Sequence, residues 1–461
     1  MKTTNSTEVQ FINHASILVK NGDIKLLSDP WYQGDAFHKG WNLIHELTDE
    51  QITNLLNEVT HIWISHEHPD HFSIMFFKKF GAKIKEQDIQ IIFQKTNDKR
   101  VESFLSKSGY NLKVIGFNSW LSLSENFEVL CIKDGFYDSG LAIKTNDKTI
   151  LNLNDCEVKD DARCIDILKI VGKCDVLVSQ FSFAAWKGGV ENIVWRKKAA
   201  KEKLDTLRLQ VKYFQPKVLV PFASYIFFSN EANSYLNDSS NKPQDVVDAF
   251  LSHDVKINIM KPFESFIDLD DSYNNQDSIL FWDDALKKVA NSKLKIYEKI
   301  ELKVLENSFL EYQERIFKNN SKIFMRVVRT LSPIAAFKPI TIKINDLNEC
   351  IKLDIFSKRL NTASATATAD ISMSSESLNF IMTNTFGFDT LTVNGCFEEE
   401  SESGFSRAAR SLAIENLNNM GIGFKPMIIF NFQLITLFIS RLIGVSKKIK
   451  LQKNDTNSMQ T

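Results

Sequence analysis

The chain has 461 residues, with 56 Lys and Arg against 57 Asp and Glu, so its formal net charge is −1. This balance excludes a generally basic nucleic-acid-binding protein, and we expect no nucleic-acid partner. Hydrophobic residues make up 43% and charged residues 25%, which excludes an intrinsically disordered chain. At roughly 150 residues per domain, the length predicts two or three domains.

The six cysteines are scattered along the chain and form no C-x-x-C pair. This spacing predicts reduced thiols in a cytosol rather than a disulfide framework. The first residues, MKTTNSTEVQF, contain no apolar run after the early lysine, so no signal peptide is expected. We therefore predict a cytoplasmic protein.

The first half of the chain alternates between strand-like and helical segments. Thr48 and Gln51 form a capping box that predicts a helix over ITNLLNEV, and the charged, periodic stretch 191–214 predicts a surface helix. Alternating elements indicate an α/β domain over residues 1–267, with helices against the faces of a sheet. The apolar runs that predict its strands are 16–20, 24–30, 61–66, 89–94, 127–132, 149–155, 175–180 and 217–221.

The second half has a different pattern. Residues 268–281 begin with a polar stretch and are expected to form a linker, and residues 282–426 are expected to form a smaller α+β domain of unknown role. Residues 282–318 are helical and charged, and a helix is expected over SESLNFIMTNTF. The runs that predict strands are 324–331, 339–346, 351–357, 365–374 and 389–397.

The last segment, 427–461, contains the apolar run 428–445 followed by SKKIKLQK. We interpret the run first as a C-terminal apolar helix that packs on the core. A helix in a membrane interface, with peripheral membrane contact through 427–450, is the second interpretation. A membrane span comes last, because Asn431, Gln433 and Arg441 interrupt the run.

The sharpest motif is His66-Glu67-His68-Pro69-Asp70-His71, which follows the apolar run HIWIS. Positions i and i+2 of a strand point the same way, so His66 and His68 can reach one metal ion. Asp70 and His71 can turn towards a neighbouring ion. Imidazole and carboxylate suit zinc, iron or manganese, and two ions about 3.5–4 Å apart can share and activate water. A polar loop with surface histidines is the alternative, but half of the eight histidines fall within residues 61–71.

A pair of ions needs a further carboxylate to bridge it. Asp155 follows the strand-like run TILNLN, and catalytic residues of α/β sheets commonly sit where a strand ends. The alternative interpretation of Asp155 is a helix cap. Together with the histidine cluster, the position favours a metal ligand.

His-x-His-x-Asp-His is the signature of the metallo-β-lactamase fold, and the chain resembles that superfamily. Within it, the chain resembles the catalytic portion of the CMP-N-acetylneuraminate hydroxylase family over roughly residues 9–262. NHAS at 13–16 is also similar to the GHAS motif of lactonase-like and phosphodiesterase-like branches. The ordered matches to the hydroxylases are DPW at 29–31, GDAFHKGWNLIHE at 34–46, ISH at 64–66, ILN at 150–152 with DC at 155–156, and QP at 215–216 with PFA at 221–223.

The resemblance implies an αββα sandwich, which is two sheets with helices outside, and a metal site at one edge. It implies that His66 and His68 hold one ion, that Asp70 and His71 hold the other, and that Asp155 bridges them. It also implies that His14 and Asp29 orient the ligands from beside the site.

Two histidines that the superfamily uses as ligands are missing here. The first would lie between the motif and Asp155, where the chain reads KDGFYDS at 133–139, and the second would lie near Asn230. Oxygen atoms of Asp134, Asp138 or Asn230 are the substitutes that we expect, with Tyr137 and Glu231 as further candidates. Oxygen ligands favour iron, manganese or magnesium over zinc. Loss of one metal site is the alternative.

The resemblance and the motif together predict a metal-dependent hydrolase. Activated water, with Asp70 as ligand and proton acceptor, would attack an ester, lactone or phosphodiester of an anionic substrate such as a sugar phosphate or nucleotide sugar. We expect one or two divalent ions, zinc first and iron or manganese as alternatives. An oxygenase of the hydroxylase type, reduced in trans, is the second interpretation. A non-catalytic binding or scaffold protein with a degenerate metal site is the third.

The hydroxylase family also carries a Rieske cluster, which requires paired cysteines and histidines. No cysteine in this chain has a histidine within three residues, so no Rieske cluster is expected in it. A weaker signal is Lys187-Gly188-Gly189, which follows the aromatic stretch FSFAAW. An ordinary turn is the simpler interpretation, and a loop that holds substrate is the alternative. The sequence does not predict an oligomeric state.

Overall fold

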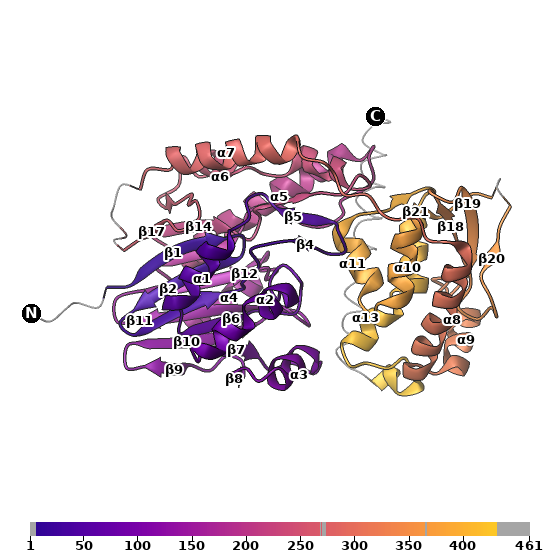
Figure 1. Cartoon of the computed structure of the whole chain (residues 1–461), viewed down its shortest axis with the longest axis horizontal. Coiled ribbons are helices and arrows are strands. Elements are labelled where there is room, and N and C mark those ends of the chain that lie inside the picture. The colour runs from indigo at the N-terminus through magenta and orange to yellow at the C-terminus, as the bar shows by residue number, and fades with distance from the viewer. Residues whose placement is uncertain (1–5, 268, 270–272, 365–366, 431–461) are drawn as a thin grey trace, which may run out of the picture. The chain divides into compact units, whose positions relative to one another are not determined.

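The computed structural model describes residues 6–267, 269, 273–364 and 367–430 (Figure 1). The chain divides into two compact units. The first consists of Met1–Glu298 together with Asp389–Glu399, and the second consists of Lys299–Phe388 together with Glu400–Thr461. The first unit therefore includes a short segment that lies far along the chain from the rest of it.

The first sheet of the first unit is buried on both faces. Its hairpin strands are antiparallel, and its strands from β3 onwards run parallel. Alternation divides the side chains between two cores: Ile17 and Val19 belong to one, and Leu18 between them belongs to the other. The strand order is β17 (Ser265–Phe266), β1 (Glu8–Asn13), β2 (Ser16–Asn21), β3 (Ile24–Ser28), β6 (His61–Ile64), β7 (Gln90–Gln94) and β8 (Leu112–Ile115).

The second sheet also has seven strands. Its central strands are parallel and almost wholly buried, which matches their continuous apolar runs. A smaller sheet joins β15 (Ile226–Phe228), β5 (Trp41–Leu43) and β4 (Asp35–Ala36). The order of the second sheet is β16 (Lys256–Ile257), β14 (Val218–Phe222), β13 (Val176–Gln180), β12 (Thr149–Asn154), β11 (Ser139–Thr145), β10 (Phe127–Lys133) and β9 (Leu121–Ser124).

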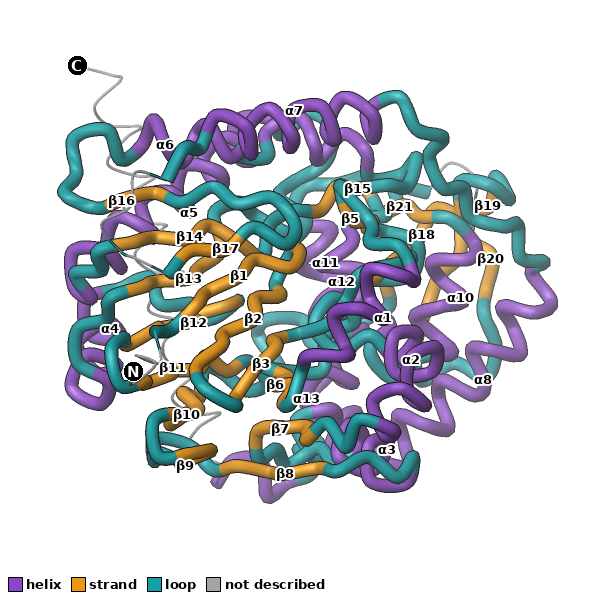
Figure 2. The backbone as a smooth tube through the Cα atoms, turned by 60° about the vertical axis from the view of Figure 1, so that its left-hand side comes forward, coloured by secondary structure: helices purple, strands orange, loops and turns teal. Residues whose placement is uncertain are grey.

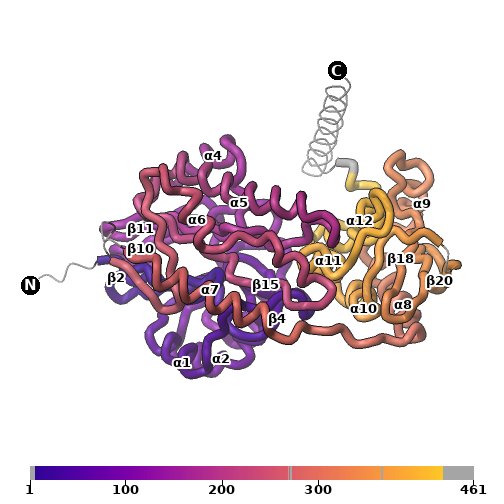
Figure 3. The backbone as a smooth tube through the Cα atoms, turned by 90° about the horizontal axis from the view of Figure 1, so that it is seen from above, coloured from indigo at the N-terminus to yellow at the C-terminus, as the bar shows by residue number. Residues whose placement is uncertain are grey.

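Helices cover the outer faces of the two sheets, and Figure 3 shows α4 and α5 on one side of the unit with α1 and α2 on the other. The helices α1 (Asp49–Glu58), α2 (Ile74–Glu86) and α3 (Arg100–Lys107) share a core with the first sheet. The helices α4 (Asp161–Val171), α5 (Ile193–Phe214), α6 (Pro243–Ala249) and α7 (Gln276–Ala290) pack with the second sheet (Figure 2). This layering confirms the predicted αββα sandwich.

Local sequence signals explain several helix boundaries. The capping box is present at α1, where the Thr48 hydroxyl accepts from the backbone amide of Gln51, and the Gln51 side chain accepts from the amide of Thr48. The Ser73 hydroxyl caps α2 immediately after the histidine motif. The Ser73 cap thus fixes the start of α2 two residues after His71.

The first unit extends further along the chain than the expected boundary at residue 267. Helix α7 begins inside the expected linker, 268–281, at Gln276, and belongs to the first unit. Trp282 is fully buried, its indole Nε1–H donates to the Met260 carbonyl at 2.9 Å, and its ring stacks on Tyr225 at a centroid distance of 4.0 Å. Because the residues just before α7 are mostly polar, the sequence did not indicate that this side chain is buried. The boundary of the first unit therefore falls near residue 298 and not at 267.

The second unit contains both strands and helices, as the predicted α+β domain requires. Its strands follow in the order β20 (Asn361–Thr362), β19 (Glu349–Leu353), β18 (Ile340–Ile344) and β21 (Ile371–Met373). Its helices are α8 (Leu302–Asn319), α9 (Lys322–Leu331), α10 (Ser375–Thr383), α12 (Gly404–Leu412) and α13 (Ile414–Asn419). Helix α10 confirms the helix expected over SESLNFIMTNTF.

Two runs that were expected to be strands are helices. Residues 324–331 lie in α9, where the Ser321 hydroxyl caps the first turn and Phe324, Val328 and Leu331 recur at helical spacing. Residues 389–394 lie in α11 (Gly387–Asn394). In both runs the β-branched residues suggested strands. In the first run, the helical spacing of the apolar positions was the better signal.

The predicted C-terminal apolar helix and its membrane contact fall largely on residues 431–461, outside the described residues. Pro426–Phe430 forms a turn of 3-10 helix. Within the part of the chain that the structure describes, no helix combines the length and apolarity needed to cross a bilayer.

The packing of α7 predicts that Trp282→Ala lowers the free energy of unfolding by about 3–5 kcal/mol, because it leaves a cavity under the helix. The measurement is urea unfolding of the full chain followed by circular dichroism. Leu280→Ala is the matched control on the same helix, since Leu280 is 54% exposed, and it should change stability by less than about 0.5 kcal/mol. Equal effects of the two substitutions would contradict the placement of α7.

Candidate metal centre

The histidine motif lies at the carboxyl end of β6. Residues 65–73 turn sharply there, because the His68 carbonyl accepts from the amides of His71 at 3.0 Å and Phe72 at 2.7 Å. Asp29 follows β3, and Asp155 follows β12, so the ends of three strands from two sheets converge. His14 joins them from the turn between β1 and β2.

Seven side chains at this edge form three overlapping groups that could hold metal ions. In each group, one ligand atom per residue lies within 4.8 Å of the others. The groups are His14, Asp70 and His71; His66, His71 and Asp155; and His66, His68 and Asp138. His71 belongs to the first and second groups, and His66 belongs to the second and third, whereas the first and third groups share no residue.

Each imidazole of the motif has one nitrogen held by a protein partner. His71 Nδ1–H donates to Asp29 Oδ2 at 3.0 Å, and His66 Nδ1–H donates to the Ser65 hydroxyl at 2.9 Å. His66 Nε2 and His68 Nδ1 then face each other at 2.8 Å. For His71, the bond to Asp29 fixes the tautomer and leaves the Nε2 lone pair for a metal ion. An ion held by His66 and His68 would replace the hydrogen bond between these two rings.

Several buried atoms of the centre have no hydrogen-bond partner among the described residues. They are His71 Nε2, Asp70 Oδ1 and His14 Nδ1. His71 Nε2 lies 3.3 Å from both Asp70 Oδ2 and Asp155 Oδ2. A buried polar atom without a partner is costly, and a cation would supply partners for the first two of these atoms. The donor set of imidazole and carboxylate therefore fits a metal ion.

Burial and short-range charges together set the pKa values of the buried groups. Burial alone would raise the pKa of Asp70, but His71 and the hydrogen bond from His14 hold it well below its usual value. Burial lowers the pKa of the His66 imidazole, and the neighbouring His71 and His68 lower it further. These shifts favour an anionic Asp70 and a neutral His66, which are the forms that bind a metal ion. Burial lowers the pKa of the His71 imidazole, but Asp70 and Asp155 outweigh it and raise that pKa well above its usual value.

The backbone is strained where three of these residues leave their strands. His14 and Asp29 both have a φ of 37°, and Asn154, just before Asp155, has a φ of 50°. Positive φ is unfavourable for residues with a Cβ, and it persists where surrounding contacts enforce it. The strain directs the side chains of these turns into one small volume.

The predicted substitute ligands differ in their positions. Asp138 lies in the group with His66 and His68, with its Oδ1 3.6 Å from His66 Nε2. Asp134 accepts from Arg163 and from the amide of Glu157, and it lies outside the three groups.

Asn230 lies in the turn after β15, where its backbone carbonyl accepts from the amides of Asn233 and Ser234. Its side-chain oxygen accepts from the amide of Ala232, and its amide group donates to the Lys39 carbonyl at 3.5 Å. Asp134 and Asn230 thus both form hydrogen bonds with nearby loops, and their role as substitute ligands stays a prediction.

Sequence reasoning missed Asp389. Its Oδ2 lies 3.9 Å from His68 Nε2, the nitrogen opposite the one that faces His66. Asp389 belongs to the first unit through the segment Asp389–Glu399. That segment is fixed by the Asn394 side chain, which donates to the Phe37 carbonyl at 3.0 Å. No local motif around Asp389 indicated a metal site. The apolar residues next to it suggested a strand over 389–397.

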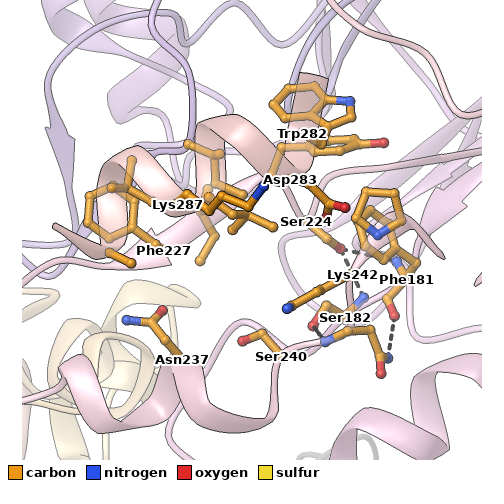
Figure 4. A pocket seen from close by; sticks show the side chains of 18 of the residues that line it. Phe181, Ser182, Ser224, Phe227, Asn237, Ser240, Lys242, Trp282, Asp283 and Lys287 are labelled. Carbon is orange, nitrogen blue, oxygen red and sulfur yellow. Dashed lines mark hydrogen bonds between the residues drawn. The ribbon is translucent and has the colours of Figure 1, made fainter. Parts of the chain in front are cut away.

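A cavity of about 670 Å³ lies apart from these groups, between α7 and the loops after β13 and β14 (Figure 4). Trp282 and Phe181 form part of its wall, and Lys242 points into it. The Ser224 hydroxyl accepts from the amides of Phe181 at 3.1 Å and Ser182 at 3.0 Å. None of the histidines or aspartates of the three groups is among its lining residues, so the cavity is not part of the metal centre.

The first unit is thus an αββα sandwich of the metallo-β-lactamase type with a His and Asp centre at one edge. No protein-family model matches the chain. Three relatives resemble it over half of its length. CMP-N-acetylneuraminic acid hydroxylase of Danio rerio is 29% identical over 50% of the chain, and that of Macaca mulatta is 28% identical over 51%. The human relative, named as inactive, is 28% identical over 51%.

These alignments cover 40%, 41% and 48% of the three relatives, so the chain spans less than half of their lengths. They confirm the resemblance that the sequence motifs indicated. Among solved structures, CmlA, a diiron β-hydroxylase from Streptomyces venezuelae, is 13% identical with a TM-score of 0.42. That likeness covers 57% of this chain and 55% of CmlA.

Igni18, a metallo hydrolase from Ignicoccus hospitalis, is 14% identical with a TM-score of 0.41. The likeness covers 57% of this chain and 97% of Igni18. The fold assignment itself follows from the sheet order and the helix layers.

Because His71 contributes to two of the three groups, we predict that His71→Ala removes at least one equivalent of bound metal per chain. Elemental analysis of the protein after equilibration with zinc measures this. The matched control is His253→Ala, because His253 is exposed and belongs to none of the three groups. Unchanged metal content in His71→Ala would show that these side chains do not form the binding site.

Proposed function

We propose that the chain is a metal-dependent hydrolase that acts on an anionic substrate. The observation that supports this is the overlap of the three groups through His66 and His71, because overlapping groups suit two neighbouring ions. His66, His68 and Asp138 would hold one ion. His14, Asp70 and His71 would hold the other, with Asp155 between them.

A bound pair of ions lowers the pKa of water and stabilises the negative charge that develops in hydrolysis. The chain's own residues prepare the site for that chemistry. Asp29 and Ser65 orient His71 and His66, and Asp389 lies at the far nitrogen of His68. The low pKa of Asp70 suits a ligand better than the proton acceptor that the sequence suggested, since a base is most effective with a pKa near the working pH.

The proposed metal is zinc, with iron or manganese as alternatives. Four imidazoles and three carboxylates make up the three groups. Zinc accepts both kinds of ligand, and each added carboxylate increases the suitability for iron and manganese. The proposed substrate class, a sugar phosphate or nucleotide sugar, is supported by the names of the relatives, which refer to a cytidine monophosphate sugar acid.

Hydroxylation is the second candidate function, and Asp138 is the observation that favours it. If Asp138 replaces the histidine that is missing between the motif and Asp155, then His66, His68 and Asp138 form a set of two histidines and one carboxylate. Such a set is typical of non-haem iron oxygenases. The relatives are named as hydroxylases. This reaction would also require molecular oxygen and electrons from a separate redox protein, whereas hydrolysis requires only water.

Hydrolysis of bis(4-nitrophenyl) phosphate by the zinc-loaded chain tests the first proposal. We expect release of nitrophenol that falls at least about 100-fold in His66→Ala, because His66 contributes to two groups. His253→Ala should keep the full rate. A chain that holds metal yet releases no nitrophenol from this and from a lactone substrate would contradict hydrolysis.

Oxygen consumption by the iron-loaded chain tests the second proposal. We expect uptake that depends on both a reductant and a CMP-sugar, and that is lost in Asp138→Asn, because an amide is a weaker ligand for iron than a carboxylate. An oxygen electrode measures the uptake. Absence of uptake and of hydrolysis in a metal-loaded chain would support the third interpretation, a binding or scaffold protein.

A further inference from the structure

Lys203 on α5 reaches the edge of the second sheet beside Asp155. Its ammonium donates to Gln180 Oε1 at 2.7 Å, at the carboxyl end of β13. The Gln180 side chain in turn donates to the Asn154 carbonyl at 3.5 Å, one residue before Asp155. These contacts place a positive charge next to the proposed bridging carboxylate.

The Lys203 ammonium is only partly satisfied. It has three donors, and among the described residues it makes one hydrogen bond and no ion pair with a carboxylate at close range. Burial lowers the pKa of this ammonium, although Asp155 and Glu157 oppose the effect at longer range. The Glu157 carboxylate already pairs with Lys159 at 2.5 Å. A half-buried cation in this position needs a counter-charge.

Lys187 is a second cation in the same region, on the loop after β13. It is half-buried, and it has neither a hydrogen bond nor a close carboxylate among the described residues. Burial lowers its pKa, and Glu157 partly opposes that effect. Glu157, which follows Asp155 by two positions, thus opposes the effect of burial on the pKa of both lysines.

The loop that carries Lys187 is held on both sides of that residue. Before it, the Trp186 amide donates to the Thr392 carbonyl at 3.1 Å. After it, the buried Arg196 guanidinium donates to the carbonyls of Gly189 at 2.5 Å and Val190 at 2.9 Å. Asp238 fixes Arg196 through two bonds of 2.9 and 2.7 Å. The Lys187 backbone is therefore placed before any ligand arrives, which lowers the entropy cost of binding.

We propose that Lys203 and Lys187 form a subsite for an oxyanion group of the substrate, a phosphate or a carboxylate, beside the metal centre. This inference rests on the proposed function. Unfilled ammonium donors attract oxyanions, and ions bound by the neighbouring aspartates would neutralise the carboxylates that otherwise compete for the lysines. The same two residues explain how a site rich in aspartates accepts a negatively charged substrate.

Isothermal titration of inorganic phosphate and of acetate into the full chain, metal-free and zinc-loaded, tests the subsite. Lys203→Met should weaken anion binding about 10- to 100-fold, and Lys203→Arg should retain most of it. The matched control is Lys201→Met, because Lys201 lies on the same helix with its side chain 74% exposed, and it should bind anions as the unaltered chain does. Preference for phosphate or for acetate identifies which oxyanion the subsite takes.

If circular dichroism shows that Lys203→Met does not fold, Lys187→Met provides an independent variant on a loop. It should also weaken anion binding about 10-fold. Normal affinity for both anions in Lys203→Met and in Lys187→Met would overturn the subsite. Zinc content, measured on the same samples, reports on the proposed function separately. A chain without zinc whose anion binding still depends on the lysines would refute the metal centre and retain the subsite.

Discussion

The buried carboxylate of Asp29 is the interaction on which the centre depends. It accepts from the Ser65 amide at 2.8 Å and hydroxyl at 2.7 Å, from the Asn154 side chain at 2.6 Å, and from His71 Nδ1 at 3.0 Å. Ser65 and His71 follow β6 of the first sheet, and Asn154 is the last residue of β12 in the second. One side chain thus joins the two sheets where the candidate ligands meet, and it turns His71 towards Asp70 and Asp155. Hydrogen bonds to a buried carboxylate are strong, so the geometry of the edge is largely determined by this residue.

Much of this edge could be predicted from the sequence, because most of the candidate ligands lie close together along the chain or directly after an apolar run. The spacing of His66, His68, Asp70 and His71 at the end of an apolar strand placed four of the candidate ligands, and the end of the later apolar run TILNLN placed Asp155. The fold followed from the same alternation of strands and helices, together with the resemblance. The structure brings these five residues into the three overlapping groups.

The remaining features depend on contacts between distant segments. From the sequence, Asp138 was one of several candidate oxygen ligands in its region. The antiparallel pairing of β10 with β11 places Asp138, and not Asp134, beside His66. Lys203 lies on a helix whose charged residues suggested a solvated face, and one turn of that helix meets the end of β13. The strand expected at 324–331 was wrong because β-branched composition outweighed helical spacing, and the boundary at 267 was early because one buried Trp lay in a polar stretch.

The return of Asp389–Glu399 to the first unit affects how the protein is made. The ribosome releases β6, β12 and their histidines and aspartates long before residue 389, and about ninety intervening residues belong to the other unit. His68 Nε2 therefore gains Asp389 as a neighbour only after most of the polypeptide has been synthesised, whereas Asp138 of its own group is made early. During that interval, the nascent chain could acquire an ion while His68 Nε2 still faces water. Metal loading and completion of the centre would then be separate events in biogenesis.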